Sequence, residues 1–202
     1  MGALLISQDV AHLSASIYAS NNLHNVDHMD TMSYLDRTIA LVEAQIALLT
    51  AASRAIAHLP GPVADVGLGN GRTYDHLREL LPDRRIFAFD KALKAATASV
   101  PPADDLILGD IRETIPYVLS RMGEPAVLIH CDIATGDPTS NLARSDWLPD
   151  LLSTIAADDA LVLSTLPLQS DRFSEVDQAD LNIAVRTNHI GLLRIYKHHP
   201  QL

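Results

Sequence analysis

A glycine-rich turn between an apolar run and a helical pattern is the feature that most restricts the fold of this chain. Residues 62–66 have the pattern of a buried strand, glycines follow at positions 67, 69 and 71, and residues 73–81 have the pattern of a helix. Glycine permits a sharp turn and a close approach of the main chain to a ligand, while the first turn of a helix offers unpaired N–H groups. The unit therefore predicts a parallel α/β sheet that binds a nucleotide-like cofactor.

A carboxylate follows the next apolar run. Residues 85–89 form that run and Asp90 ends it. In a doubly wound sheet the end of the second strand lies beside the first glycine turn, so Asp90 is expected to accept hydrogen bonds from both ribose hydroxyls. Dinucleotide folds have the spacing GxGxxG, whereas this turn has GxGxG. The spacing disfavours an NAD-dependent oxidoreductase, which stays open as an alternative.

Three motifs in order resemble those of one enzyme family. Residues 65–71, Asp-Val-Gly-Leu-Gly-Asn-Gly, resemble the first motif of class I S-adenosylmethionine-dependent methyltransferases. Residues 106–111, Leu-Ile-Leu-Gly-Asp-Ile, are similar to the third-strand motif of that family, and residues 126–132 form a fourth apolar run that ends in an acid. The resemblance implies S-adenosyl-L-methionine as the cofactor, S-adenosyl-L-homocysteine as its product, and methyl transfer as the activity.

The resemblance also implies roles for individual residues. Asp110 would receive the adenine amine, and the backbone N–H of Ile111 would reach a ring nitrogen. Asp90 would hold the ribose, and Asp65 would lie near the methionine ammonium, directly or through water. Capping of a following helix is an alternative for Asp110, and for Asp90 before a helix expected over residues 92–98. The predicted cofactor-binding residues are Asp65, Gly67, Leu68, Gly69, Asn70, Gly71, Thr73, Asp90, Lys91, Gly109, Asp110, Ile111 and Asp132.

Candidates for a catalytic base lie at the end of the fourth apolar run. Methyl transfer from a sulfonium is an in-line displacement, so a base is needed only when the acceptor must lose a proton. The candidates are His130, Asp132 and Asp137, because they lie at or after the strand end that faces the expected methyl group. His130 could instead be a core histidine paired with a neighbouring helix. Asp132 could contact the cofactor or cap the following loop.

The expected acceptor loop carries no recognisable acceptor motif. Residues 133–138, where methyl acceptors bind in the family, lack the Asn/Asp-Pro-Pro-Tyr-like sequence of many amino-group methyltransferases.

The sequence also offers no convincing metal site. The fifth apolar run, residues 160–165, ends in hydroxyl residues rather than the Asp-Asn pair of the metal-dependent catechol-type enzymes. His24 and His28 are spaced for one helix face, but no third ligand follows at a convincing spacing. No metal is predicted, and the first thirty residues are expected to select the substrate.

The composition bears on the class of methyl acceptor and on the compartment of the cell. The formal net charge is −10, and phosphate binding needs a positive stripe, so a small-molecule acceptor is favoured over nucleic acid. The single cysteine, Cys131, suits a reduced core residue, and no export or lipid signal is visible, which together favour the cytoplasm. A non-catalytic protein that binds the cofactor or its demethylated product as a regulator is the alternative to an enzyme.

The expected architecture is an α/β three-layer sandwich. A mostly parallel, seven-stranded Rossmann-like sheet with a reversed last strand would occupy residues 61–202, and residues 1–60 would form an N-terminal helical cap of the same single domain, residues 1–202. The last two strands are expected at residues 182–186 and 192–197, after a polar helix or loop at residues 171–180.

The cap is expected to contain an amphipathic helix over residues 38–59. Charged and polar residues within this segment argue against a membrane span. Apolar residues recur at spacings of four and three, which predicts one core-facing side and could also support a homo-oligomer seam. The residues of that predicted side are Leu35, Ile39, Val42, Ile46, Leu49 and Ile56.

Overall fold

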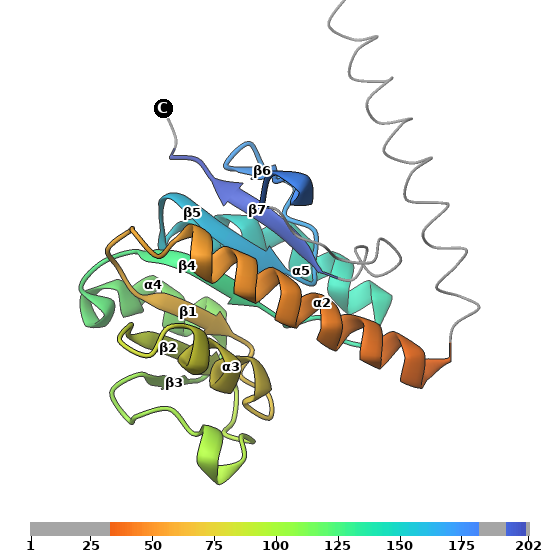
Figure 1. Ribbon diagram of the computed structural model, residues 1–202, viewed down its shortest axis with the longest axis horizontal. Coiled ribbons are helices and arrows are strands. Elements are labelled where there is room, and N and C mark those ends of the chain that lie inside the picture. Colours follow the sequence, from red (N-terminus) through yellow and green to blue (C-terminus); the bar gives the residue numbers. More distant parts are fainter. Residues whose placement is uncertain (1–32, 182–192, 201–202) are drawn as a thin grey trace, which may run out of the picture.

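Two helical layers enclose one twisted sheet. The computed structural model describes residues 33–181 and 193–200. Helices α2 and α3 cover one face of the sheet, and α4 and α5 cover the other (Figure 1). The elements are α2 Tyr34–Ala55, β1 Val63–Val66, α3 Arg72–Leu80, β2 Ile86–Asp90, η1 Thr97–Ser99, β3 Leu106–Leu108, α4 Ile111–Met122, β4 Ala126–Cys131, α5 Pro138–Ser153, β5 Ala156–Ser164, β6 Phe173–Glu175, η2 Gln178–Leu181 and β7 Arg194–His198.

The seven strands lie in the order β3-β2-β1-β4-β5-β7-β6. Strand β1 pairs in parallel with β2 on one side and β4 on the other, so the strand order reverses there. Strand β7 is antiparallel to both of its neighbours. The predicted mostly parallel, seven-stranded sheet with a reversed last strand is confirmed. In such a sheet, ligands bind outside the carboxyl ends of the strands at the point of reversal.

Two local predictions are wrong. The sixth strand is β6, inside the segment predicted as a polar helix or loop, while the strand predicted at residues 182–186 lies outside the described residues. A three-residue edge strand with only Phe173 buried has no alternating pattern to recognise. Residues 92–98 form no α-helix, because this segment packs against the glycine turn, where the Ala96 N–H donates to the Asn70 carbonyl. Tertiary contacts here override helix propensity.

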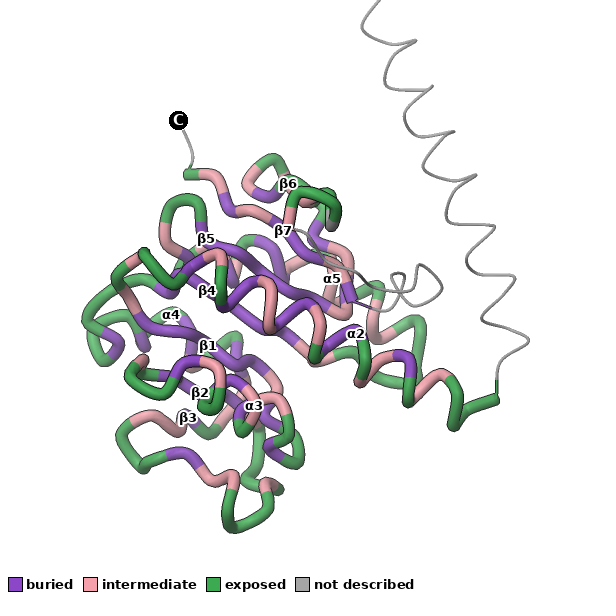
Figure 2. The backbone as a smooth tube through the Cα atoms, in the orientation of Figure 1, coloured by how far each residue is buried: buried purple, intermediate pink, exposed green. Residues whose placement is uncertain are grey.

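Helix α2 buries a different face from the one predicted. Leu49 and Ile56 are buried as expected, but Leu35, Ile39 and Ile46 keep exposed fractions of 66%, 48% and 48% (Figure 2). The buried face is made of Ala40, Ala44, Gln45, Leu48, Leu49, Ala52 and Ser53. Its alanines permit close packing on the sheet, while the larger residues that set the predicted stripe lie beside it. The core contact of α2 is therefore rotated, and the polar Gln45 becomes buried.

By length and composition, α2 is apolar enough to cross a membrane. It is the only such helix in the part of the chain that the structure describes, and core helices of water-exposed domains pass the same test. Leu48 and Leu49 of α2 join one core cluster with residues of β1, α3 and β4. The packing is that of a core helix.

The rotation of α2 predicts unequal costs for two substitutions of similar size. Leu48→Ala should lower the free energy of unfolding by about 2–5 kcal/mol, because it leaves a cavity in the core. Ile46→Ala should lower it by less than about 1 kcal/mol, because that side chain is half-exposed. Urea unfolding of both variants measures the difference. Equal losses would indicate that Ile46 is buried, as the sequence pattern predicted.

Candidate functional site

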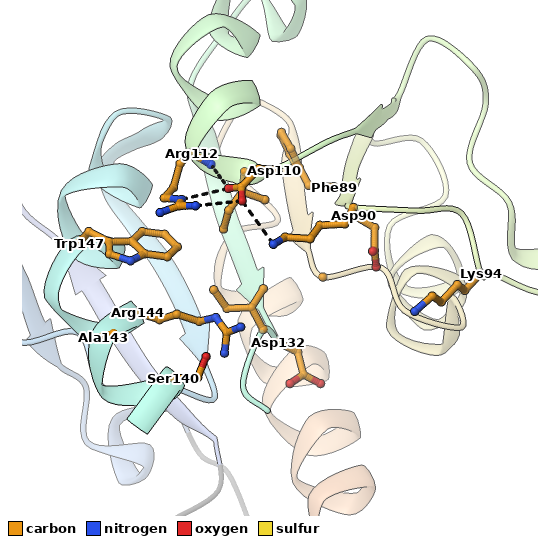
Figure 3. Close-up of a pocket in the computed structure, with 14 residues that line it drawn as sticks. Phe89, Asp90, Lys94, Asp110, Arg112, Asp132, Ser140, Ala143, Arg144 and Trp147 are labelled. Atoms are coloured by element: carbon orange, nitrogen blue, oxygen red, sulfur yellow. Dashed lines mark hydrogen bonds and ion pairs between the residues drawn. The ribbon is translucent and has the colours of Figure 1, made fainter. Parts of the chain in front are cut away.

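A cavity of about 470 Å³ opens at the carboxyl ends of β1 to β4 (Figure 3). At least one lining residue lies at the end of each of these strands or in the loop that follows it, and α5 closes the opposite side. This is the crevice expected at the point where the strand order reverses. Its lining residues are Gly67, Phe89, Asp90, Lys91, Lys94, Asp110, Ile111, Arg112, Asp132, Ile133, Ser140, Ala143, Arg144 and Trp147.

The glycine turn follows β1 directly and needs its glycines. Gly67, Gly69 and Gly71 all have positive φ, at 99°, 54° and 86°. A Cβ on Gly67 would collide with the main-chain carbonyl of Asp132, so only glycine lets the turn lie against the end of β4. Leu68 points into the core, whereas Asn70 is exposed. The turn therefore presents main chain, rather than side chains, to the cavity.

Asp90 is tied to the glycine turn. Its Oδ2 accepts from the Gly69 N–H at 2.7 Å, and its Oδ1 accepts from the Ala92 N–H at 3.2 Å. No α-helix follows for Asp90 to cap. Each carboxylate oxygen has two lone pairs, so both oxygens retain capacity toward the cavity that Asp90 lines. The arrangement suits a ligand with two adjacent hydroxyls.

Asp110 binds two cations and caps α4. Its carboxylate accepts from the Arg112 N–H at 3.0 Å and from the Arg112 guanidinium through both oxygens, and Lys91 Nζ lies at 3.3 Å (Figure 3). The hydrogen bonds from Arg112 hold the pKa of Asp110 well below its usual range. The Arg112 guanidinium also lies 5.5 Å from the centre of the Trp147 ring. Asp110 therefore caps α4, as the alternative interpretation predicted, and it also lines the cavity.

Asp65 and His130 form a buried pair away from the cavity. Both side chains are 0% exposed, and His130 Nδ1 lies 2.7 Å from Asp65 Oδ1. Thr73 Oγ1 contacts the same carboxylate at 3.4 Å. Burial lowers the pKa of His130, but the hydrogen bond and charge of Asp65 outweigh it, so the pKa is raised overall. His130 is a core histidine, and its partner lies on a neighbouring strand rather than on a helix.

The two remaining acids of the predicted catalytic set lie in different surroundings. Asp132 lines the cavity and accepts a hydrogen bond from Gln45 Nε2 at 3.1 Å. Asp137 is exposed, lies outside the cavity and caps α5 by accepting from the N–H groups of Thr139 and Ser140. Only Asp132 of the three predicted catalytic residues therefore lines the cavity.

Several lining residues carry no motif and were missed from the sequence. Ser140, Ala143, Arg144 and Trp147 lie on one face of α5, at spacings of three and four. This spacing is the signal that could have found them, once Asp137-Pro138 is taken as a helix start. Gln45 was missed because the prediction of the core-facing side used apolar residues alone.

The structure offers no metal centre in the chain segments that it describes, where no three His, Cys, Asp or Glu residues form a suitable group. His24 and His28 lie outside the described residues, as do the first thirty residues that were expected to select the substrate. Cys131 is buried, and this burial raises the pKa of its thiol.

Comparisons with known proteins identify relatives. Residues 32–188 match the family model described as S-adenosyl-L-methionine methyltransferase. The crystal structure of an S-adenosyl-L-methionine methyl transferase from Silicibacter pomeroyi is 34% identical, with a TM-score of 0.73, over 83% of this chain and 99% of that one. Among curated proteins, none matches the chain.

Two further solved structures are similar to the chain at lower scores. The plantazolicin methyltransferase BpumL, in complex with SAH, is 15% identical with a TM-score of 0.43, over 64% of this chain and 48% of that one. The sugar N-methyltransferase KedS8 from Streptoalloteichus sp. is 16% identical with a TM-score of 0.43, over 66% and 55%. At these values neither protein identifies an acceptor for this chain.

The raised pKa of His130 predicts a pH dependence of stability. The protonated pair with Asp65 contributes fully below the pKa of about 6.5 that an unfolded histidine has, and its contribution is lost as the pH rises through the higher folded value. The free energy of unfolding should therefore fall with rising pH above about 6.5. Urea unfolding at several pH values should show this slope in the wild type and in the exposed-site control His58→Gln, but not in His130→Gln. An unchanged slope in His130→Gln would contradict the assignment.

Proposed function

The chain belongs to the S-adenosyl-L-methionine methyltransferase family, and from this premise we propose that the carboxyl ends of β1 to β4 hold the cofactor and that a small molecule accepts the methyl group. The observation that carries the proposal is the tie between Asp90 and the Gly69 N–H, because it brings the expected ribose acid and the glycine turn to one cavity. The nicotinamide alternative is set aside by the family match.

The residues of the cavity fit the parts of the cofactor in order. The glycine turn would face the methionine part, Asp90 would accept from the ribose hydroxyls, and Asp110 with the Ile111 N–H would bind the adenine edge. Lys91 would lie at the adenine end, since it already contacts Asp110. Gly109 has a φ of 141° and donates its N–H to the Asp90 carbonyl, which supports the turn between the ribose and adenine positions.

Leu68, Asn70 and Thr73 would act indirectly. Leu68 anchors the turn in the core, the Asn70 side chain accepts from the Arg72 N–H, and Thr73 contacts the carboxylate of Asp65. Asp65 would support the site from inside the core without touching the ligand, because it is buried against His130. These four residues hold the main chain in the shape that binding requires.

When bound, the cofactor supplies an activated methyl group on a sulfonium. The task of the protein is then to align an acceptor with that carbon and to receive a proton where the acceptor carries one. Asp132 is the candidate acceptor of this proton, because among the three predicted bases, His130, Asp132 and Asp137, it alone lines the cavity. His130 would contribute only indirectly, by joining β4 to Asp65 of β1 in the core.

A small-molecule acceptor is supported by charge. The chain carries 25 acidic residues against 15 Lys and Arg, and long-range repulsion of a phosphate backbone opposes nucleic acid binding. Lys94 and Arg144 line the cavity and give it a local positive side that would suit a compact acidic acceptor. We further propose that the enzyme works in the cytoplasm, away from membranes, and that homo-oligomers could form.

Asp90→Ala should weaken binding of both S-adenosyl-L-methionine and S-adenosyl-L-homocysteine by about ten- to a hundredfold, because hydrogen bonds to a carboxylate are lost. Asp158→Ala, an exposed acid near the amino end of β5, is the control and should leave affinity unchanged. Calorimetric titration measures both ligands, with NADH as a third that should not bind. Unchanged affinity in Asp90→Ala would refute the ribose assignment.

The acceptor class can be tested with S-adenosyl-L-methionine that carries a radioactive methyl group. Incubation with separated metabolite, RNA and protein fractions of a bacterial extract should label the metabolite fraction. At saturating S-adenosyl-L-methionine, Asp132→Asn should reduce the labelling rate when the acceptor loses a proton, while Asp137→Asn, which retains a capping side chain, should not. Label in RNA or protein instead would overturn the small-molecule acceptor.

A further inference from the structure

We propose that Gln45 is a positioning residue that holds the carboxylate of Asp132 toward the amino end of the cofactor, where Asp132 receives the α-ammonium group. This inference rests on the proposed function, because it assumes that the glycine turn faces the methionine part of the ligand. It assigns a role in the site to α2, a helix without any recognisable motif.

The acid expected to serve the ammonium group is not available. Asp65 is 0% exposed, and its carboxylate is bound by His130 at 2.7 Å and by Thr73. It does not line the cavity. At 0% exposure, this carboxylate has no surface that a ligand group could contact directly. Any carboxylate that meets the ammonium group must therefore be one that lines the cavity.

Asp132 lies next to the Gly67 end of the glycine turn, whereas Asp90 is bound to Gly69. The main-chain carbonyl of Asp132 lies so close to Gly67 that a Cβ there would collide with it. Its N–H donates to the Val66 carbonyl at 2.9 Å, so the residue is fixed at the end of β1 as well as of β4. The side chain is half-buried and lines the cavity. The amino end of a ligand on the turn would lie within its reach.

Gln45 fixes the direction of that side chain. The amide lies on the buried face of α2, is 7% exposed, and donates from Nε2 to Asp132 Oδ2 at 3.1 Å. One hydrogen bond occupies one lone pair of one oxygen, so the rest of the carboxylate can still accept. A buried donor of this kind restricts rotation of Asp132 before a ligand arrives, which reduces the entropy lost on binding.

The neutral charge of Gln45 matters as much as its position. Asp110, at the other end of the cavity, is paired with two cations, Arg112 and Lys91. Asp132 receives its hydrogen bond from an uncharged amide, so its negative charge is not cancelled by this partner. An oriented carboxylate with an uncharged hydrogen-bond donor favours a cationic ligand group, and the α-ammonium is the cationic group at that end of the cofactor.

The experiment compares two ligands that differ at the amino end. S-adenosyl-L-homocysteine carries the α-ammonium, and methylthioadenosine shares its adenosine and sulfur but lacks the amino-acid group. Gln45→Met keeps the length and removes the donor, while Ile46→Met is the control on the next, half-exposed residue of α2. Calorimetry should show about tenfold weaker binding of S-adenosyl-L-homocysteine to Gln45→Met, with methylthioadenosine within about twofold of wild type.

Asp132→Asn and the double variant complete the cycle. Asp132→Asn should lose at least as much affinity for S-adenosyl-L-homocysteine as Gln45→Met, and adding Gln45→Met to it should cost little more. Equal weakening of both ligands by Gln45→Met would assign Gln45 a purely structural role, and unchanged affinity would also overturn the inference. If the wild-type protein bound neither S-adenosyl-L-methionine nor its product, the proposed function itself would fail.

Discussion

The contact between the Gly67 backbone and the carbonyl of Asp132 is the constraint on which the site depends. It lets the turn after β1 lie against the end of β4, in space that any Cβ would fill. Main-chain hydrogen bonds then tie the four strand ends in sequence: Asp132 to Val66, Gly67 to Phe89, and Gly109 to Asp90. Each bond lies at or just beyond a strand end. The cavity is therefore a rigid extension of the sheet, and its acids are placed by the backbone.

Sequence patterns predicted the parts of this arrangement that are local. The turn, the strands β1 to β4 and the acids at their ends are each contained in a few consecutive residues, so apolar runs and glycines suffice to locate them. The partners of those acids are not local. The pairing of Asp65 with His130 depends on the register between β1 and β4, which no short pattern fixes. Edge strand β6 left no pattern because only one of its residues is buried.

Helix α2 shows why an apolar stripe can point the wrong way. Apolar residues occur on nearly all sides of this helix, and the largest of them suggested the face. The sheet instead selects the side with alanines, since small residues permit close packing and leave room for the side chains of the strands. The same rotation buries Gln45 and brings its amide to Asp132. The side of α2 that faces the site is therefore the one with the buried polar residue Gln45, not the one with the large apolar residues.

The partners of Asp110 are compatible with the proposal that one carboxylate both caps α4 and binds the adenine amine. Lys91 and Arg112 are mostly exposed, with side-chain exposed fractions of 73% and 61%, and exposed ion pairs contribute at most about 1 kcal/mol. Exchange of the single Lys91 contact for the amine of an adenine ring would therefore cost little, whereas Arg112 binds through both oxygens. The backbone bond from Arg112 keeps the carboxylate oriented during the exchange. In the proposed complex Arg112 would remain over the Trp147 ring, whose centre is 5.5 Å from its guanidinium.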